Sequence, residues 1–129
     1  MRLLLDTHTL IWAVDDPLQI PSVAMTAMAD SANDRLVSTA TIWEMAIKFS
    51  KGRLPLSLPY RPWMNKAIAD LALTVLPITL DHTERQSELS WHHRDPFDRL
   101  LATQALVEGI PLVSTDTIFD QYGVTLLWK

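Results

Sequence analysis

The sequence has 129 residues, 48% of them hydrophobic, which is enough for one compact domain and too little for two. Its formal net charge of -4 argues against a protein that holds nucleic acid through a broad basic surface, because such a surface needs clustered Lys and Arg. The absence of cysteine excludes disulfides, thiolate zinc sites and cysteine nucleophiles, and leaves only oxygen and imidazole ligands for any metal.

The apolar segments of the sequence are short. The first of them, Leu3–Leu5, stops at Asp6 and is far too short for the core of a signal peptide. No later segment approaches the roughly 20 apolar residues needed to cross a bilayer. We therefore expect a soluble cytoplasmic protein that has no membrane partner.

Short apolar runs alternate with stretches of helical character along the whole chain, without a repeat or a linker that would mark a domain boundary. Such runs predict buried strands, which we expect at residues 2–6, 35–38, 74–78, 110–114 and 124–128. Helices are expected between them, at about residues 7–14, 21–31, 39–52, 63–73, 81–90 and 96–109, with a short helical turn within 115–122. This alternation indicates a parallel sheet that is covered on both faces.

Cap and turn residues set the limits of several elements. Thr39 or Thr41 can cap the third helix, and the Pro-rich residues 54–62 are predicted to form a loop. The helix near the C-terminus is the clearest, because Asp95 suits the N-cap and Pro96 suits the first helical position. The N-cap role explains Asp95 fully, so we keep it out of the candidate site.

Four acids far apart in the sequence fall where such a fold would place a ligand. Open parallel sheets bind ligands beyond the carboxyl ends of their strands, where the strand order reverses. Asp6 and Asp116 follow predicted strands, Glu44 lies one turn inside a helix, and Asp98 lies in the first turn of another. We therefore expect these four carboxylates to converge.

The segments that carry these acids resemble the motifs of one family. Leu3–His8 (LLLDTH) is similar to its opening strand, and Trp43–Lys48 (WEMAIK) is similar to its second acidic helix. His93–Leu100 (HRDPFDRL) resembles the most specific motif of a subgroup, and Ser114–Asp116 (STD) resembles the closing element. In order and spacing, the chain resembles the PIN-domain family and its VapC-like toxins of type II toxin-antitoxin systems over nearly its entire length.

The resemblance implies a three-layer α/β/α sandwich with a central parallel sheet, as a single domain over residues 1–129. It also implies an endoribonuclease that hydrolyses RNA phosphodiester bonds with metal-activated water, Mg²⁺ or Mn²⁺ as cofactor, and a cognate antitoxin as partner. The family's acidic positions, catalytic and metal-binding, match Asp6, Glu44, Asp98 and Asp116. Thr7 and Ser114 are weaker candidates for supporting hydrogen bonds, and the roles of His8 and Asp120 stay open.

A carboxylate cluster suits this chemistry, because Mg²⁺ and Mn²⁺ prefer hard oxygen ligands. Without cations, two carboxylates about 4 Å apart repel by roughly 4 kcal/mol at an effective dielectric constant near 20. We therefore expect a divalent cation to raise the thermal stability of the protein.

Each acid also has a purely structural interpretation. Asp6 and Asp116 could cap the helices that follow them, and Asp98 could complement a helix dipole. Glu44 could pair with Lys48 at i, i+4, although it interrupts an otherwise apolar helix. The four together favour a shared site.

Histidines and basic residues give weaker signals. No HExxH or similar spacing supports a zinc site, and His92 and His93 are interpreted as polar residues at a helix end. A small basic cluster could contact phosphates, although a solvated face is the preferred interpretation. Its members are Lys48, Lys51, Arg53 and Arg61.

Trp43 and Trp63 flank the Pro-rich loop, and an apolar surface there would suit a partner helix or a homodimer contact. On this basis we expect a homodimer. Most of the five tryptophans are interpreted as core residues rather than base-stacking platforms.

Two other function classes fit a domain of this size. A phosphoacceptor receiver module would need neighbouring acids after its first strand and a lysine near its last, but Asp6 is followed by Thr7 and the only late lysine is Lys129. A non-catalytic binding domain would be expected to have lost at least one of the four acids.

Overall fold

The centre of the molecule is a five-stranded sheet in which every pairing between neighbouring strands is parallel. The computed structural model describes the whole chain, residues 1–129. The strand order is β3-β2-β1-β4-β5. The strands are β1 (Arg2–Leu5), β2 (Asp34–Ser38), β3 (Leu73–Leu76), β4 (Leu112–Val113) and β5 (Leu126–Leu127).

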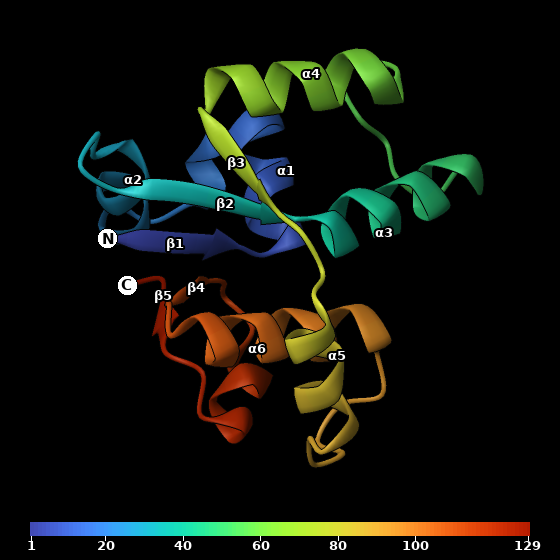
Figure 1. Cartoon of the computed structure of the whole chain (residues 1–129). Helices are drawn as coiled ribbons and strands as arrows, with labels where there is room; N and C mark the ends of the chain where they lie inside the picture. Colours follow the sequence, from blue (N-terminus) through green and yellow to red (C-terminus); the bar gives the residue numbers. More distant parts are fainter.

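Helices cover both faces of this sheet, so the molecule has three layers (Figure 1). In Figure 1, α4 and α1 lie on the upper side of the sheet, α5, α6 and the last helical turn lie below it, and α3 extends away from the end of β2. Helix α2 lies beside the starts of β1 and β2 and packs in the same core as α1 and α4. This arrangement confirms the predicted fold class. The helices are α1 (Thr7–Asp15), α2 (Ser22–Ala29), α3 (Thr39–Ser50), α4 (Tyr60–Asp70), α5 (Leu80–Ser87) and α6 (Pro96–Glu108), with 3-10 helices η1 (Pro17–Gln19) and η2 (Thr117–Tyr122).

The first strand is buried on both faces, as its unbroken apolar run predicts. Leu3 and Leu5 pack in a core with α1 to α4, and Leu4 packs in a second core with α6 and η2. All three side chains are fully buried, and each contributes about 2 kcal/mol of hydrophobic stabilisation. Because β1 joins the two cores, the position of the residue that follows it is closely fixed.

Several helices and strands begin or end at other residues than predicted. Ser38, rather than Thr39 or Thr41, caps α3, and its side chain accepts a hydrogen bond from the Ala40 N–H at 3.0 Å. Helix α4 begins at Tyr60, inside the Pro-rich stretch, because a proline in the first turn has no N–H that needs a helical partner. The strands β4 and β5 are also shorter than predicted.

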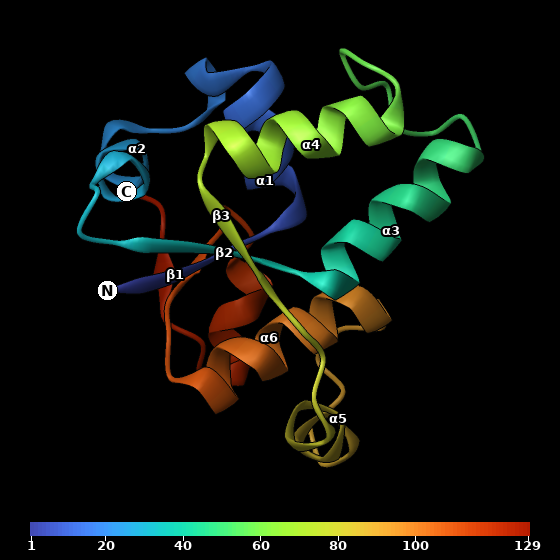
Figure 2. The ribbon, with the colours of Figure 1, turned by 45° about the horizontal axis from the view of Figure 1, so that its top comes forward.

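The chain leaves β1 in one direction across the sheet, through β2 to β3, and returns to the other side for β4 and β5 (Figure 2). The order therefore reverses between β1 and β4, whose ends are in register at Leu5 and Val113. The Asp6 N–H donates to the Val113 carbonyl at 3.1 Å, so the residues after these two strands lie side by side. No helix combines the length and the apolar character that a membrane span requires.

Candidate active site

Asp6 lies at the reversal point of the sheet, immediately after β1. The residue is 6% exposed, and its carboxylate accepts hydrogen bonds from the Thr7 N–H to Oδ1 and from the Ser114 hydroxyl to Oδ2, both at 2.7 Å. Burial raises the pKa of Asp6, and these two hydrogen bonds oppose the shift. Both carboxylate oxygens are therefore held by groups from two adjacent strand ends. Asp6 also caps α1, so its structural interpretation and its place in the site are compatible.

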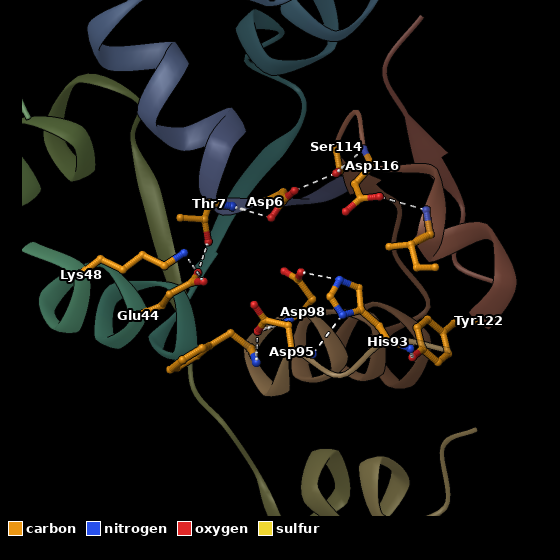
Figure 3. A network of polar contacts seen from close by, with 12 residues as sticks. Asp6, Thr7, Glu44, Lys48, His93, Asp95, Asp98, Ser114, Asp116 and Tyr122 are labelled. Atoms are coloured by element: carbon orange, nitrogen blue, oxygen red, sulfur yellow. Dashed lines mark hydrogen bonds and ion pairs between the residues drawn. The ribbon is translucent and has the colours of Figure 1, made fainter. Parts of the chain in front are cut away.

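Glu44 reaches the same region from α3. Its side chain is buried, and its two oxygens accept hydrogen bonds from the Thr7 hydroxyl at 2.7 Å and from Lys48 Nζ at 2.9 Å. Thr7 thus connects Glu44 with Asp6 through one residue. The ion pair with Lys48 forms as its i, i+4 spacing allows, and it leaves Glu44 facing the other acids (Figure 3).

Asp98 carries the clearest electrostatic sign of an acidic cluster. Burial, followed by the charges of Asp6, Asp95, Glu44 and Asp116, raises the pKa of Asp98 from 3.8 to about 7. Three carboxylates from distant parts of the chain, together with the nearby Asp95, therefore act on one group. A cluster of this kind is unfavourable without a cation, which is the behaviour expected of a site built to hold one.

Asp116 follows β4 and completes the group. One of its oxygens accepts a hydrogen bond from the Ile118 N–H at 3.0 Å, which caps η2, and its side chain is exposed. Ligand atoms of His93, Asp98 and Asp116 all lie within 4.8 Å of one another. Figure 3 shows the carboxylates of Asp6, Glu44, Asp98 and Asp116 around a common space.

The structure therefore brings the four predicted acids together. Thr7 and Ser114 make the supporting hydrogen bonds for which they were candidates. Asp95 is the N-cap of α6, as predicted, and its Oδ1 accepts from the N–H groups of Phe97 and Asp98 at 2.8 and 3.2 Å. The roles of the acids as metal ligands and catalytic groups stay a prediction.

His93 is a contact of the site that the sequence interpretation missed. It was expected to be only a polar residue at a helix end, whereas its Nε2 lies 3.1 Å from Asp98 Oδ2. The signal was its position two residues before Asp95, within the HRDPFD segment, but no periodicity or ligand spacing marks it. His92, its neighbour, is exposed, and its ring packs against that of Tyr122 in a T-shaped arrangement.

The two residues left open have different positions. His8 is exposed and lines a cavity beside Glu44, and its charge is one of the influences that oppose the rise in the pKa of Asp6. Asp120 lies on the exposed side of η2, and it is absent from the group of residues close enough to share a cation. Asp120 is therefore a suitable control for the four acids.

A hollow of about 440 Å³ opens beside Glu44, between α3 and the start of α6. Lys48, Lys51 and Arg53 line it, and so do the acidic residues Glu44 and Asp95. The fourth member of the predicted basic cluster, Arg61, lies on α4 and contacts Asn65 instead. Three of the four predicted basic residues thus face this space, which is large enough for a nucleotide.

The predicted apolar surface around the Pro-rich loop is half correct. Trp63 is fully buried, and its Nε1 donates to the carboxylate of Asp15 at 3.0 Å, so it belongs to the core. Trp43 is 62% exposed, and its ring meets Phe97 edge-on with 5.4 Å between the ring centroids. Trp91 is also exposed, and its ring covers the guanidinium of Arg99.

Comparison with known proteins agrees with this architecture. The family model described as "PIN domain" matches residues 3–124 of the chain. No curated protein matches the sequence. The chain is similar in structure to VapBC2 from Rickettsia felis, solved bound to a DNA fragment from its promoter, with a TM-score of 0.73, 19% identity and 100% of both chains covered.

Two further solved structures have the same fold. VapBC-1 from nontypeable Haemophilus influenzae gives a TM-score of 0.69 at 16% identity, covering 98% of this chain and 96% of that one. A member of the VapBC family of toxin-antitoxin systems, VapBC-5 from Mycobacterium tuberculosis, gives 0.61 at 18% identity, covering 99% and 98%. At these identities the likeness establishes the shared fold, while the chemistry has to be argued from the site.

Proposed function

Because the chain belongs to the PIN-domain family, we propose that it is a divalent-metal-dependent endoribonuclease that hydrolyses phosphodiester bonds of RNA. The observation that carries this proposal is the convergence of Asp6, Glu44, Asp98 and Asp116 at the reversal point of the parallel sheet. The choice of RNA as substrate rests on the resemblance to VapC toxins.

The donor set fits Mg²⁺ or Mn²⁺. All four acids offer oxygen, and the chain has no thiolate that would favour a softer metal. Asp98 and Asp116 would hold the cation, with Asp6 and Glu44 completing the acidic site. When bound, such an ion lowers the pKa of water and neutralises charge on a phosphate that is being attacked.

The chain's own residues prepare this site before any ion or substrate arrives. Ser114 fixes one oxygen of Asp6, and Thr7 fixes one oxygen of Glu44, each through a short hydrogen bond from a buried hydroxyl. Partners of this kind orient acidic ligands and reduce the rearrangement that binding would require. Near neutral pH, the Asp98 carboxyl of the ion-free protein carries a proton part of the time, which limits repulsion among the acids.

The cavity beside Glu44 offers a path for the substrate backbone. The net charge of -4 disfavours general attraction of RNA, so positive charge has to be local. Lys48 is already paired with Glu44, so Lys51 and Arg53 supply it along the cavity wall. We assign them to phosphates that flank the bond to be cut, where they would set position rather than sequence preference.

We further propose that the protein is the toxin of a type II toxin-antitoxin pair, with a cognate antitoxin and a second copy of this chain as partners. The structural similarity to members of VapBC systems supports the antitoxin. The exposed ring of Trp43 supports an apolar contact with another chain.

The test is cleavage of total bacterial RNA by the purified protein in millimolar Mn²⁺, with EDTA as the metal-free arm. Alanine at each of the four acids should lower the cleavage rate by about 100-fold or more, whereas Asp120→Ala should cut as wild type does. Full activity of the Asp98→Ala protein would remove Asp98 from the mechanism. Formation of a phosphoprotein with acetyl phosphate, without RNA cleavage, would favour the receiver alternative instead.

Biological role needs a separate experiment. Expression of the wild-type protein should stop bacterial growth, and the same alanine substitutions should relieve the arrest. Harmless overexpression of an active nuclease would contradict the toxin role while leaving the enzymatic proposal intact. Light scattering of the purified protein measures whether it is a dimer.

A further inference from the structure

His93 lies in the segment between α5 and α6 and is held at three points. Its backbone N–H donates to the Tyr122 hydroxyl at 2.7 Å, its ring Nδ1 accepts from the Asp95 N–H at 3.0 Å, and its Nε2 lies 3.1 Å from Asp98 Oδ2. The side chain is 27% exposed. Figure 3 shows the ring between Tyr122 and the acidic site, with its edge toward Asp98.

These contacts determine which ring nitrogen carries the proton. A neutral imidazole has one N–H donor and one acceptor nitrogen. Because a backbone N–H points at Nδ1, that nitrogen has to supply the lone pair. The proton therefore lies on Nε2, which faces the Asp98 carboxylate and can only donate to it.

We propose that His93 is a positioning residue of this site: it donates its Nε2–H to Asp98 Oδ2, thereby aims the carboxylate toward the other acids, and does not bind the metal through nitrogen. The inference rests on the proposed function in that it takes Asp98 to be a metal ligand. His93 lies close enough to Asp98 and Asp116 to act as a metal ligand with them, but the inferred role is a different one.

By distance alone, His93 would complete a cation site with Asp98 and Asp116. Coordination through Nε2 needs a lone pair there, so the proton would have to move to Nδ1, where it would meet the Asp95 N–H. Asp95 cannot turn away easily, because its side chain caps α6 through the N–H groups of Phe97 and Asp98. The helix cap therefore fixes the tautomer, and the metal site keeps oxygen ligands only.

Tyr122 connects this arrangement to the opposite side of the site. It is a buried residue at the end of η2, and the same helix begins just after Asp116. The segment that carries Asp116 thus also anchors the backbone of the residue that orients Asp98. The two carboxylates are positioned by one connected set of contacts, so a change at His93 should affect metal binding more than folding.

The first experiment needs neither metal nor RNA. Long-range ¹H–¹⁵N spectra of the metal-free protein at about pH 8 report which nitrogen of each neutral histidine is protonated, and His93→Gln identifies the signal. We expect a protonated Nε2 and a bare Nδ1 for His93. A proton on Nδ1 would overturn the assignment.

The second experiment measures Mn²⁺ binding and the nitrogen coupling of bound Mn²⁺ by electron spin resonance. His93→Ala should weaken binding by about 10- to 100-fold, the range seen when a ligand's orienting partner is lost. His93→Gln should stay within about threefold of wild type, because its amide N–H can replace the Nε2–H donor. His92→Gln is the matched control, and thermal melts verify that each variant folds.

The outcomes separate the inference from the proposed function. Directly coordinated histidine nitrogen in wild type that disappears in His93→Gln, equal losses in the Gln and Ala variants, or no Mn²⁺ binding by wild type would each overturn the positioning role. The expected tautomer and Mn²⁺ affinities in a protein that cuts no RNA would instead leave His93 as assigned and refute the ribonuclease.

Discussion

Replacing Asp98 by asparagine should make the metal-free protein more stable while removing its response to metal. Burial and four neighbouring carboxylates raise the pKa of Asp98 from 3.8 to about 7, so ionisation of this group opposes folding. The penalty is absent below about pH 4, grows as the pH rises toward 7, and is complete above it. Asparagine cannot ionise, and its amide oxygen can still accept from His93 Nε2.

The size of the effect follows from the shift. About three pKa units correspond to roughly 4 kcal/mol, since one unit is about 1.4 kcal/mol. The Asp98 side chain is 22% exposed, and water screens its repulsion, so we expect about half of this, roughly 2 kcal/mol. For a domain of this size that corresponds to a rise in Tm of roughly 5–10 °C.

The assay is thermal unfolding at about pH 8, in EDTA and in millimolar Mn²⁺. In EDTA, Asp98→Asn should melt above wild type; in Mn²⁺, wild type should gain stability and the variant should gain little. Asp120→Asn, which removes an exposed carboxylate of η2, should follow wild type in both buffers. The reasoning is refuted if Asp98→Asn melts below wild type in EDTA, or if Mn²⁺ stabilises both proteins equally.

Three further perturbations test the support of the site, the substrate path and the core. Ser114→Ala removes the hydroxyl that donates to Asp6 and should weaken Mn²⁺ binding by about tenfold in calorimetry, while the surface variant Ser50→Ala should bind normally. Replacing Lys51 and Arg53 by glutamine should lower the salt dependence of RNA affinity, with a change in slope of about 0.7 for each phosphate that the variant no longer binds; an unchanged slope would place the RNA elsewhere. Trp63→Phe removes the hydrogen bond to Asp15 and should cost about 1–3 kcal/mol in urea unfolding with Mn²⁺ affinity unchanged, so weakened Mn²⁺ binding by a stably folded variant would contradict a purely structural role.

The accuracy of the sequence predictions follows from how local each signal is. Asp95 as N-cap and the end of α6 at Gly109 were correct because both depend on a few adjacent residues, and Gly109 adopts the left-handed conformation, with a φ of 66°, that glycine favours. The cap of α3 is Ser38 rather than the predicted Thr39 or Thr41, since neighbouring hydroxyls compete for the same role. Trp63 was misplaced because a tryptophan at a loop edge looks the same in sequence whether it turns inward or outward.

The residues of the candidate site also differ in whether the sequence alone could indicate them. Asp6, Glu44, Asp98 and Asp116 could be selected beforehand, because the ends of parallel strands and the first two turns of nearby helices lie at one edge of the sheet. His93 could not be selected, since its role depends on the distance of its ring from Asp98 and on the N–H that faces its other nitrogen. Neither contact leaves a periodic pattern in the sequence.

Hydrophobic pattern and capping residues by themselves determined that this chain forms alternating strands and helices, and the resemblance of its acidic segments indicated which carboxylates to consider. Only the tertiary structure decided that β1 and β4 are neighbours, that the other acids raise the pKa of Asp98, and that a histidine donates to it. The physical reason is range: burial period and capping act within a few residues, whereas electrostatic and hydrogen-bonding geometry depends on contacts such as that between Asp6 and Ser114, which are 108 positions apart.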